Sequence, residues 1–119
     1  FVGFGREDDA DTVSRMASKL ANLRVFESEG SKFGASALEV GAEVLTVSQF
    51  TLLADTGRGR KPNFSRAASQ ELARDLYTRL ARDLQREGVT TVLAAPFRTR
   101  LEVDVVNWGP FTVVLDHSP

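Results

Sequence analysis

The chain has 119 residues, 42% hydrophobic and 26% charged, which predicts one globular domain over residues 1–119 and excludes a disordered or fibrous chain. It contains no cysteine and one histidine, which excludes disulfides, thiolate or multi-histidine metal sites and a cysteine nucleophile. The net charge of −1 argues against a generic polyanion binder. The apolar runs are too short to cross a membrane, and no signal-peptide pattern opens the chain. We therefore expect a soluble, cytoplasmic domain.

Residues 1–5 have the pattern of the last part of a buried strand. Asp8 or Asp9 then caps a helix, because acidic residues favour the positive end of the helix dipole. Its apolar stripe consists of Val13, Met16, Ala17, Leu20 and Leu23. A short strand over residues 23–26 and a polar turn over residues 27–34 are expected to follow.

The second half begins with the most strand-like segment, residues 43–53, which has β-branched residues at its centre. A second helix is predicted over residues 69–87, with Gly88 as its left-handed end. Its buried face is expected to hold Leu72, Ala73, Leu76, Tyr77, Leu80, Ala81 and Leu84. Three short strands are predicted next, at residues 90–94, 101–106 and 111–115. This order of elements predicts an α/β or α+β domain in which helices pack on a mixed sheet.

Two segments stand out by charge. Residues 7–11 hold four acidic residues, and residues 57–66 hold four basic and no acidic residues. The acidic segment is most simply a helix start. The basic segment is either a solvated loop or a surface that meets a phosphate backbone, and its charge alone leaves both interpretations open.

The usual catalytic patterns are missing from the sequence. It has neither a complete dinucleotide-binding loop nor a lysine-serine phosphate loop. A serine-histidine-acid triad would have to use His117, which we expect to be solvated because it lies in the tail. Any catalytic polar groups must therefore be hydroxyls, amides and backbone N–H groups, with neither a metal nor another cofactor.

Two short segments are unusual. Ser48-Gln49-Phe50-Thr51 interrupts an apolar strand with polar groups, and Gly109-Pro110 lies between two predicted strands. Simple alternation at a sheet edge accounts for the first, and an ordinary turn accounts for the second. General physical principles alone favour these structural explanations for both segments over a functional site.

These segments belong to four spaced motifs. Residues 48–55 read S-Q-F-T-L-L-A-D and residues 59–65 read G-R-K-P-N-F-S. Residues 106–112 read V-N-W-G-P-F-T, and residues 22–26 read N-L-R-V-F. In this order and spacing, over residues 1–116, the chain strongly resembles the D-aminoacyl-tRNA deacylase (D-tyrosyl-tRNA deacylase) family.

The resemblance implies an enzyme that hydrolyses the ester of D-aminoacyl-tRNA, or of glycyl-tRNA, as a proofreading step of translation. It implies a three-layer β/β/α fold and a homodimer in which the Gly-Pro motif of one subunit closes the site of the other. The catalytic residues that it implies are Ser48, Gln49, Phe50 and Thr51. The substrate and chiral-gate residues that it implies are Gly109, Pro110, Phe97 and Asn107. With this family in view, the basic segment is expected to contact tRNA through Arg58, Arg60 and Lys61.

An aminoacyl ester is already activated, so a positioned water and backbone donors near Phe50 and Thr51 would suffice for hydrolysis. We also expect a cis peptide between Gly109 and Pro110.

The chain departs from the family pattern at three places. Trp108 replaces a small or acidic residue, Arg98 and Leu101 change an F-G-x-x-M motif, and about two initial strands with a V-Q-R-V segment are lacking. We therefore expect an N-terminally truncated form of the fold. The alternative function is a non-catalytic paralogue that binds nucleic acid or protein.

Overall fold

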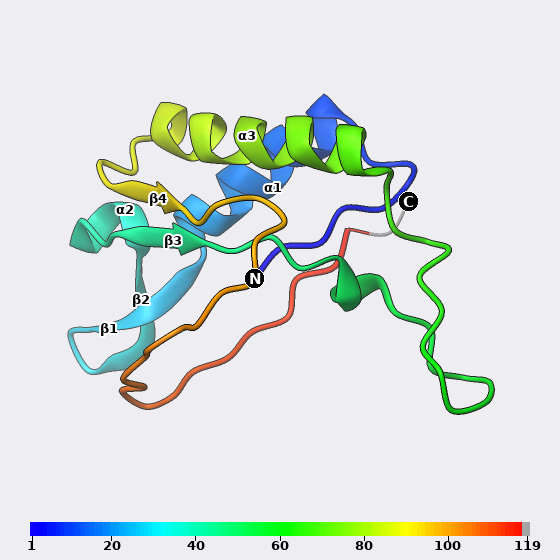
Figure 1. Ribbon diagram of the computed structural model, residues 1–119. Helices are drawn as coiled ribbons and strands as arrows, with labels where there is room; N and C mark the ends of the chain where they lie inside the picture. The colour runs from blue at the N-terminus through cyan, green and yellow to red at the C-terminus, as the bar shows by residue number, and fades with distance from the viewer. Residues whose placement is uncertain (118–119) are drawn as a thin grey trace.

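A computed structural model describes residues 1–117 (Figure 1). The elements are α1 (Ala10–Asn22), β1 (Arg24–Ser28), β2 (Ser31–Ser36), α2 (Ala37–Val40), β3 (Val44–Thr46), the 3₁₀ helix η1 (Phe50–Leu53), α3 (Gln70–Glu87) and β4 (Val92–Ala94). Helices α1 and α3 lie on one side of β3 and β4, and the extended segment 101–117 lies on the other. Among the described residues, no helix is long and apolar enough to cross a membrane.

Both long helices begin where their capping residues predict, and α3 also ends where its capping glycine predicts. The Asp9 carboxylate accepts a hydrogen bond from the backbone N–H of Thr12, at 2.8 Å, and starts α1. The Ser69 hydroxyl accepts one from the N–H of Leu72, at 3.2 Å, and starts α3. Gly88 ends α3 at φ +113, a backbone conformation that favours glycine. The predicted bounds of the second helix are therefore confirmed to within one residue.

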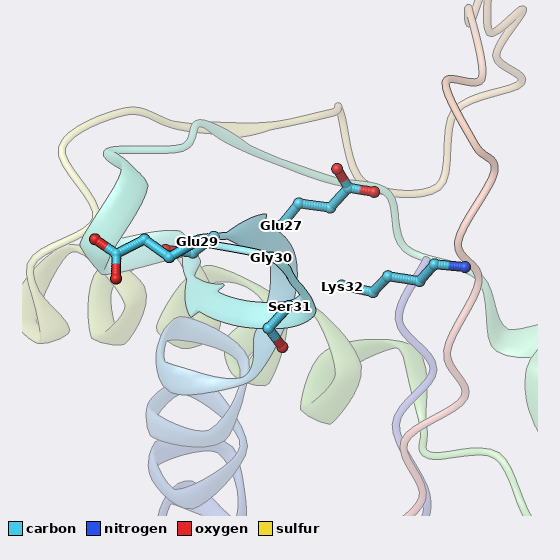
Figure 2. Close-up of a pocket in the computed structure, with 6 residues that line it drawn as sticks. Glu27, Glu29, Gly30, Ser31 and Lys32 are labelled. Atoms are coloured by element: carbon cyan, nitrogen blue, oxygen red, sulfur yellow. The ribbon is translucent and has the colours of Figure 1, made fainter.

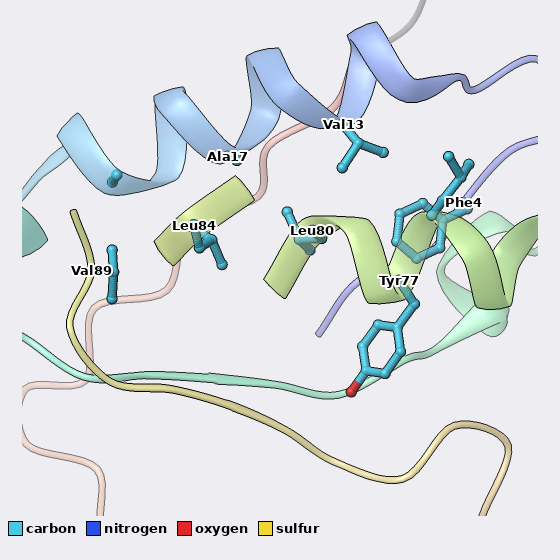
Figure 3. Close-up of a cluster of buried hydrophobic side chains, with 9 residues drawn as sticks. Phe4, Val13, Ala17, Tyr77, Leu80, Leu84 and Val89 are labelled. Carbon is cyan, nitrogen blue, oxygen red and sulfur yellow. The ribbon is translucent and has the colours of Figure 1, made fainter. Parts of the chain in front are cut away.

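The core lies between α1, α3 and β3–β4, as Figure 3 shows. Its buried members are Phe4, Val13, Ala17, Ala21, Leu76, Tyr77, Leu80, Leu84 and Val89. The face predicted for α3 is confirmed at Leu76, Tyr77, Leu80 and Leu84. On α1 the small residues Ala17 and Ala21 are buried and let α3 approach closely, whereas Met16 is only half-buried and Leu20 is exposed. Of the predicted apolar stripe, Met16, which we expected in the core, and Leu20 therefore lie outside the buried core cluster.

Parallel and antiparallel pairs both occur, which confirms the α/β class. β3 pairs with β4 in parallel, with Val44 opposite Val92. β1 pairs with β2 in an antiparallel hairpin. The first residues add an isolated parallel bridge from Val2 to Ser48 in place of the strand predicted for residues 1–5.

Two further differences from the predictions lie between residues 27 and 53. The strand expected over residues 43–53 stops at Thr46, and the chain turns into η1 four residues later. The turn expected over residues 27–34 contains strand β2 instead. Gly34 lies in β2, where a Cβ atom would approach the Cβ of Ser28 to 2.7 Å. This glycine is therefore needed for close strand pairing, not for a turn.

Residues 101–117 form no strand, although strands were predicted at 101–106 and 111–115. The segment runs as extended chain along the side away from the helices (Figure 1). A strand is defined by its hydrogen-bonded neighbour, and the described residues offer these segments none. The segment contacts β2 through the ring of Phe111, whose centroid lies 5.0 Å from that of Phe33. Its apolar side chains are mostly exposed.

Candidate active site

A pocket of about 440 Å³ lies where the chain leaves β3 and β4. The two strands are parallel, so their carboxyl ends meet at one edge, which is where α/β folds commonly bind ligands. The segment after β3 contributes residues 47–50 to the pocket wall, and the segment after β4 contributes residues 98–101 and Val103. Ser48, Gln49 and Phe50, predicted as site residues, are thus brought together here.

The Ser48–Thr51 segment is held by the first residues of the chain. The Val2 N–H donates to the Val47 carbonyl at 2.9 Å, and the Gln49 N–H donates to the Val2 carbonyl at 2.7 Å. The 3₁₀ helix that begins at Phe50 leaves the N–H groups of Phe50 and Thr51 without an acceptor within residues 1–117. These two backbone donors are therefore unpartnered, and that of Phe50 belongs to a residue that lines the pocket. Unpartnered N–H groups can stabilise an oxygen that gains negative charge. Thr51 itself is exposed and does not line the pocket.

Tyr77 of α3 anchors both segments that form the pocket. Its hydroxyl lies 2.9 Å from the Thr46 carbonyl and 2.7 Å from the Ala95 carbonyl, and can donate to either (Figure 3). Its ring lies 5.8 Å from the ring of Phe97, over which the Arg74 guanidinium lies at 5.4 Å. Phe97, predicted to bind substrate, is thus half-buried against α3 and does not line the pocket.

Arg98 follows Phe97 in a turn and lines the pocket together with Arg100. Its φ is +54, a left-handed value that is uncommon for a residue with a side chain. A left-handed value suits glycine, which the F-G-x-x-M motif of the family has at this position. In this chain an arginine adopts it.

The basic segment is a loop whose base is fixed. Asp55 and Asn63 pair through two backbone hydrogen bonds of 2.7 and 2.9 Å, and residues 56–62 between them are exposed. The Phe64 ring packs edge-on against the Phe50 ring at 4.9 Å, so the end of the loop touches the start of η1. The loop extends away from the rest of the molecule (Figure 1), and Arg58, Arg60 and Lys61 on it are exposed.

The Gly109-Pro110 peptide is cis, as predicted. Asn107, Gly109 and Pro110 are exposed and do not line the pocket of their own subunit. Phe111, next along the chain, contacts β2 instead. Within one chain, the predicted chiral-gate residues Asn107, Gly109 and Pro110 therefore do not join Ser48, Gln49 and Phe50 at the pocket.

A second hollow, of about 330 Å³, lies at the turn between β1 and β2 (Figure 2). Glu27 and Lys32 point to one side of the hairpin and Glu29 to the other. None of the predicted site residues lines it, and we assign no role to it.

The sequence profile of the family described as D-Tyr-tRNA(Tyr) deacylase matches residues 1–116. The chain belongs to this family. The D-aminoacyl-tRNA deacylase of Desulforudis audaxviator (strain MP104C) is 48% identical over 115 residues, which are 97% of this chain and 76% of that protein. The enzyme of the same name from Bacillus licheniformis is 44% identical, over 97% of this chain and 78% of that protein.

Among solved structures, the c-Myc DNA Unwinding Element Binding Protein superposes with a TM-score of 0.90 at 32% identity. The match covers 99% of this chain and 80% of that one. Membership of the deacylase family, identified from the four motifs, is thus confirmed together with the fold.

Sequence reasoning missed several residues that line the pocket. Val47, Thr99, Arg100 and Val103 line the pocket without belonging to any predicted site. Only their position in the sequence could have indicated them, because each lies within ten residues after the end of β3 or β4. In the described part of the chain, no three side chains of the kinds that bind metals lie close together. The exposed His117 ring lies 3.4 Å from the Arg15 guanidinium of α1 and does not line the pocket.

Proposed function

We propose that the chain hydrolyses the ester bond of D-aminoacyl-tRNA, and of glycyl-tRNA, and releases the amino acid and free tRNA in the cytoplasm. The observation that carries the proposal is the Ser48–Thr51 segment at the pocket, with two free backbone donors. The names of the relatives at 48% and 44% identity support it as well. They do not favour the non-catalytic alternative.

The reaction needs few groups. A water oxygen bonds to the ester carbonyl carbon, and the carbonyl oxygen gains negative charge that the N–H groups of Phe50 and Thr51 stabilise. The bond from that carbon to the ribose oxygen then breaks, and the ribose oxygen takes a proton that the water loses. The ribose 2′-hydroxyl and the Thr51 hydroxyl are the groups that orient the water, since neither histidine nor cysteine is available nearby.

The experiment compares D-tyrosyl-tRNA with L-tyrosyl-tRNA, because a chiral proofreading enzyme must release only the first. Thr51→Ala is compared with Thr90→Ala, an exposed threonine of the α3–β4 connection. A loss of about tenfold for Thr51→Ala is expected if the hydroxyl orients water, and a larger loss would give it the leading role. No release of D-tyrosine by the wild-type chain would contradict the proposal.

We further propose a homodimer in which Gly109-Pro110 of one subunit closes the pocket of the other. The exposed apolar side chains of segment 101–117 support it, since they need a covering surface: Val103, Val105, Val106, Trp108, Phe111, Val113 and Val114. The gate would reject an L side chain by steric clash with its backbone. The basic loop would bind tRNA phosphates.

Subunit mixing tests the shared site. A variant disabled at Gln49 and Thr51 is mixed with Gly109→Ala, which is strained because Gly109 has φ +123. When equal amounts of the two inactive variants pair at random, about half of the dimers contain one of each. If each site uses both subunits, one of the two sites in such a dimer is intact, so about a quarter of wild-type activity returns. No recovery, with dimers present, would contradict the shared site.

A further inference from the structure

We infer that Arg98 is a phosphate-binding residue that positions the RNA end of the substrate in the pocket. The inference rests on the proposed function and adds the group that recognises one part of its substrate. Arg98 is a pocket residue with an unusual backbone conformation, and both facts need an explanation.

The backbone around Arg98 is fixed on both sides. The Phe97 ring is held by Tyr77 and Arg74, at 5.8 and 5.4 Å. The Thr99 hydroxyl donates to the Phe97 carbonyl at 3.4 Å. Arg98 has a positive φ within a turn, a backbone conformation in which glycine is preferred. Arginine is therefore held here against its backbone preference, and such positions cluster at functional sites.

The pocket has a clear electrostatic bias. Its wall contains two arginines, Arg98 and Arg100, and no acidic residue. Neither arginine forms an ion pair within residues 1–117, in contrast to Arg79 and Arg86, which both contact Asp83. Two unneutralised guanidinium groups in one concave wall attract an anion.

The substrate offers one kind of anion near its reactive ester. The α-ammonium of the aminoacyl group is positive, so an arginine beside it would repel it. The phosphodiester before the terminal nucleoside is negative, and a guanidinium can bind it through two parallel hydrogen bonds. The phosphate group is therefore the ligand that fits Arg98, and the ester carbonyl is left to the backbone donors of Phe50 and Thr51.

The test uses two substrates, D-tyrosyl-tRNA and the D-tyrosyl ester of adenosine, which has no phosphate. Arg98→Gly retains a backbone suited to φ +54, and Arg98→Lys retains the charge. With D-tyrosyl-tRNA we expect Arg98→Gly to raise KM about tenfold with kcat within twofold, and Arg98→Lys to recover part of the loss. For Arg98→Gly, the slope of log affinity for tRNA against log salt concentration should fall in magnitude by about 0.7, the value for one phosphate contact on a single strand. With the adenosine ester, wild type and both variants should react alike.

Arg82→Gln is the control, because Arg82 is an exposed arginine of α3 outside the pocket. An equal loss on both substrates would overturn the inference, because the residue would then act on the ester or on the fold. A loss confined to D-aspartyl-tRNA would also overturn it, since Arg98 would then recognise a side-chain carboxylate. Failure of the wild-type chain on both substrates would remove the proposed function and this inference with it.

Discussion

The helical layer and the C-terminal segment 101–117 use apolar residues in opposite ways. In the helical layer, Leu84 and Ala17 are fully buried between α1, α3 and β3. In the C-terminal segment, Val106 and Trp108 are 92% and 97% exposed. The first region satisfies its own hydrophobic surface, whereas the second carries a surface that only another chain segment can cover. The pocket takes residues 47–50 from the segment after β3 and Leu101 and Val103 from the C-terminal segment, whereas Gly109 and Pro110 do not line it.

The largest expected effect is on the free energy of unfolding, which should respond very differently to a substitution in each region. Leu84→Ala should lower the free energy of unfolding by about 3 kcal/mol, because it leaves a cavity in a packed core. Val106→Ala should change it by less than about 0.5 kcal/mol at low protein concentration, since an exposed methyl group loses little. Urea unfolding measures both. A cost at Val106 as large as that at Leu84 would contradict the comparison.

The next largest effect is expected from removing the polar contacts that join α1 and α3. Asp83 is buried and accepts a hydrogen bond from the Ser14 hydroxyl at 2.8 Å. Arg79 and Arg86 also contact its carboxylate, at 3.3 and 3.4 Å. Asp83→Ala should lower the free energy of unfolding by about 1–2 kcal/mol, because it removes the hydrogen bond to Ser14 and both ion pairs, while the Arg79 and Arg86 side chains keep 39% and 67% of their surface in solvent.

Asp75→Ala is the matched control, because Asp75 is an exposed acidic residue of the same helix. Its effect on thermal unfolding should be negligible. Equal effects of the two substitutions would show that helix propensity, not the link to Ser14, determines the loss at Asp83.

The contrast between the two regions also explains what the sequence could and could not predict. α3 was predicted within one residue because Ser69, Gly88 and the leucine spacing are local signals. Residues 111–115 have an equally strong strand pattern and form no strand, because pairing depends on a neighbour that local signals do not specify. The strand predicted over residues 43–53 was too long for a similar reason: Ser48, just before the 3₁₀ helix, pairs with Val2, a distant partner that local signals do not specify.

The candidate site divides in the same way. Ser48, Gln49 and Phe50 were predicted from a motif and do line the pocket. Phe97 was predicted for the pocket, but it packs against Tyr77. A single sequence cannot decide between these roles, because aromatic residues after a strand suit a core and a pocket equally.

A smaller effect is expected from the basic loop, residues 57–61, which belongs to neither region. Alanine at its three basic positions should weaken tRNA binding and reduce the slope of log affinity against log salt by two to three units at most. Fold stability should be unaffected, because the loop base is fixed by backbone bonds of Asp55 and Asn63. Filter binding at several salt concentrations measures the slope. An unchanged slope would mean that the loop is only solvated.

The smallest expected effect concerns the start of α1. Hydrogen bonds from the backbone N–H and then the hydroxyl of Thr12 lower the pKa of the Asp9 carboxyl below its ordinary value of 3.8. Because the folded value is the lower one, the charged carboxylate stabilises the fold fully above pH 3.8. That contribution is lost as pH falls from 3.8 through the folded value. Asp9→Asn keeps a capping oxygen but removes the titration. Thermal unfolding from pH 7 to pH 2.5 should therefore show a small deficit for the variant at neutral pH that vanishes in acid. A deficit of constant size across that range would show that the cap depends on geometry alone, and that charge at this end of the helical layer adds nothing to its stability.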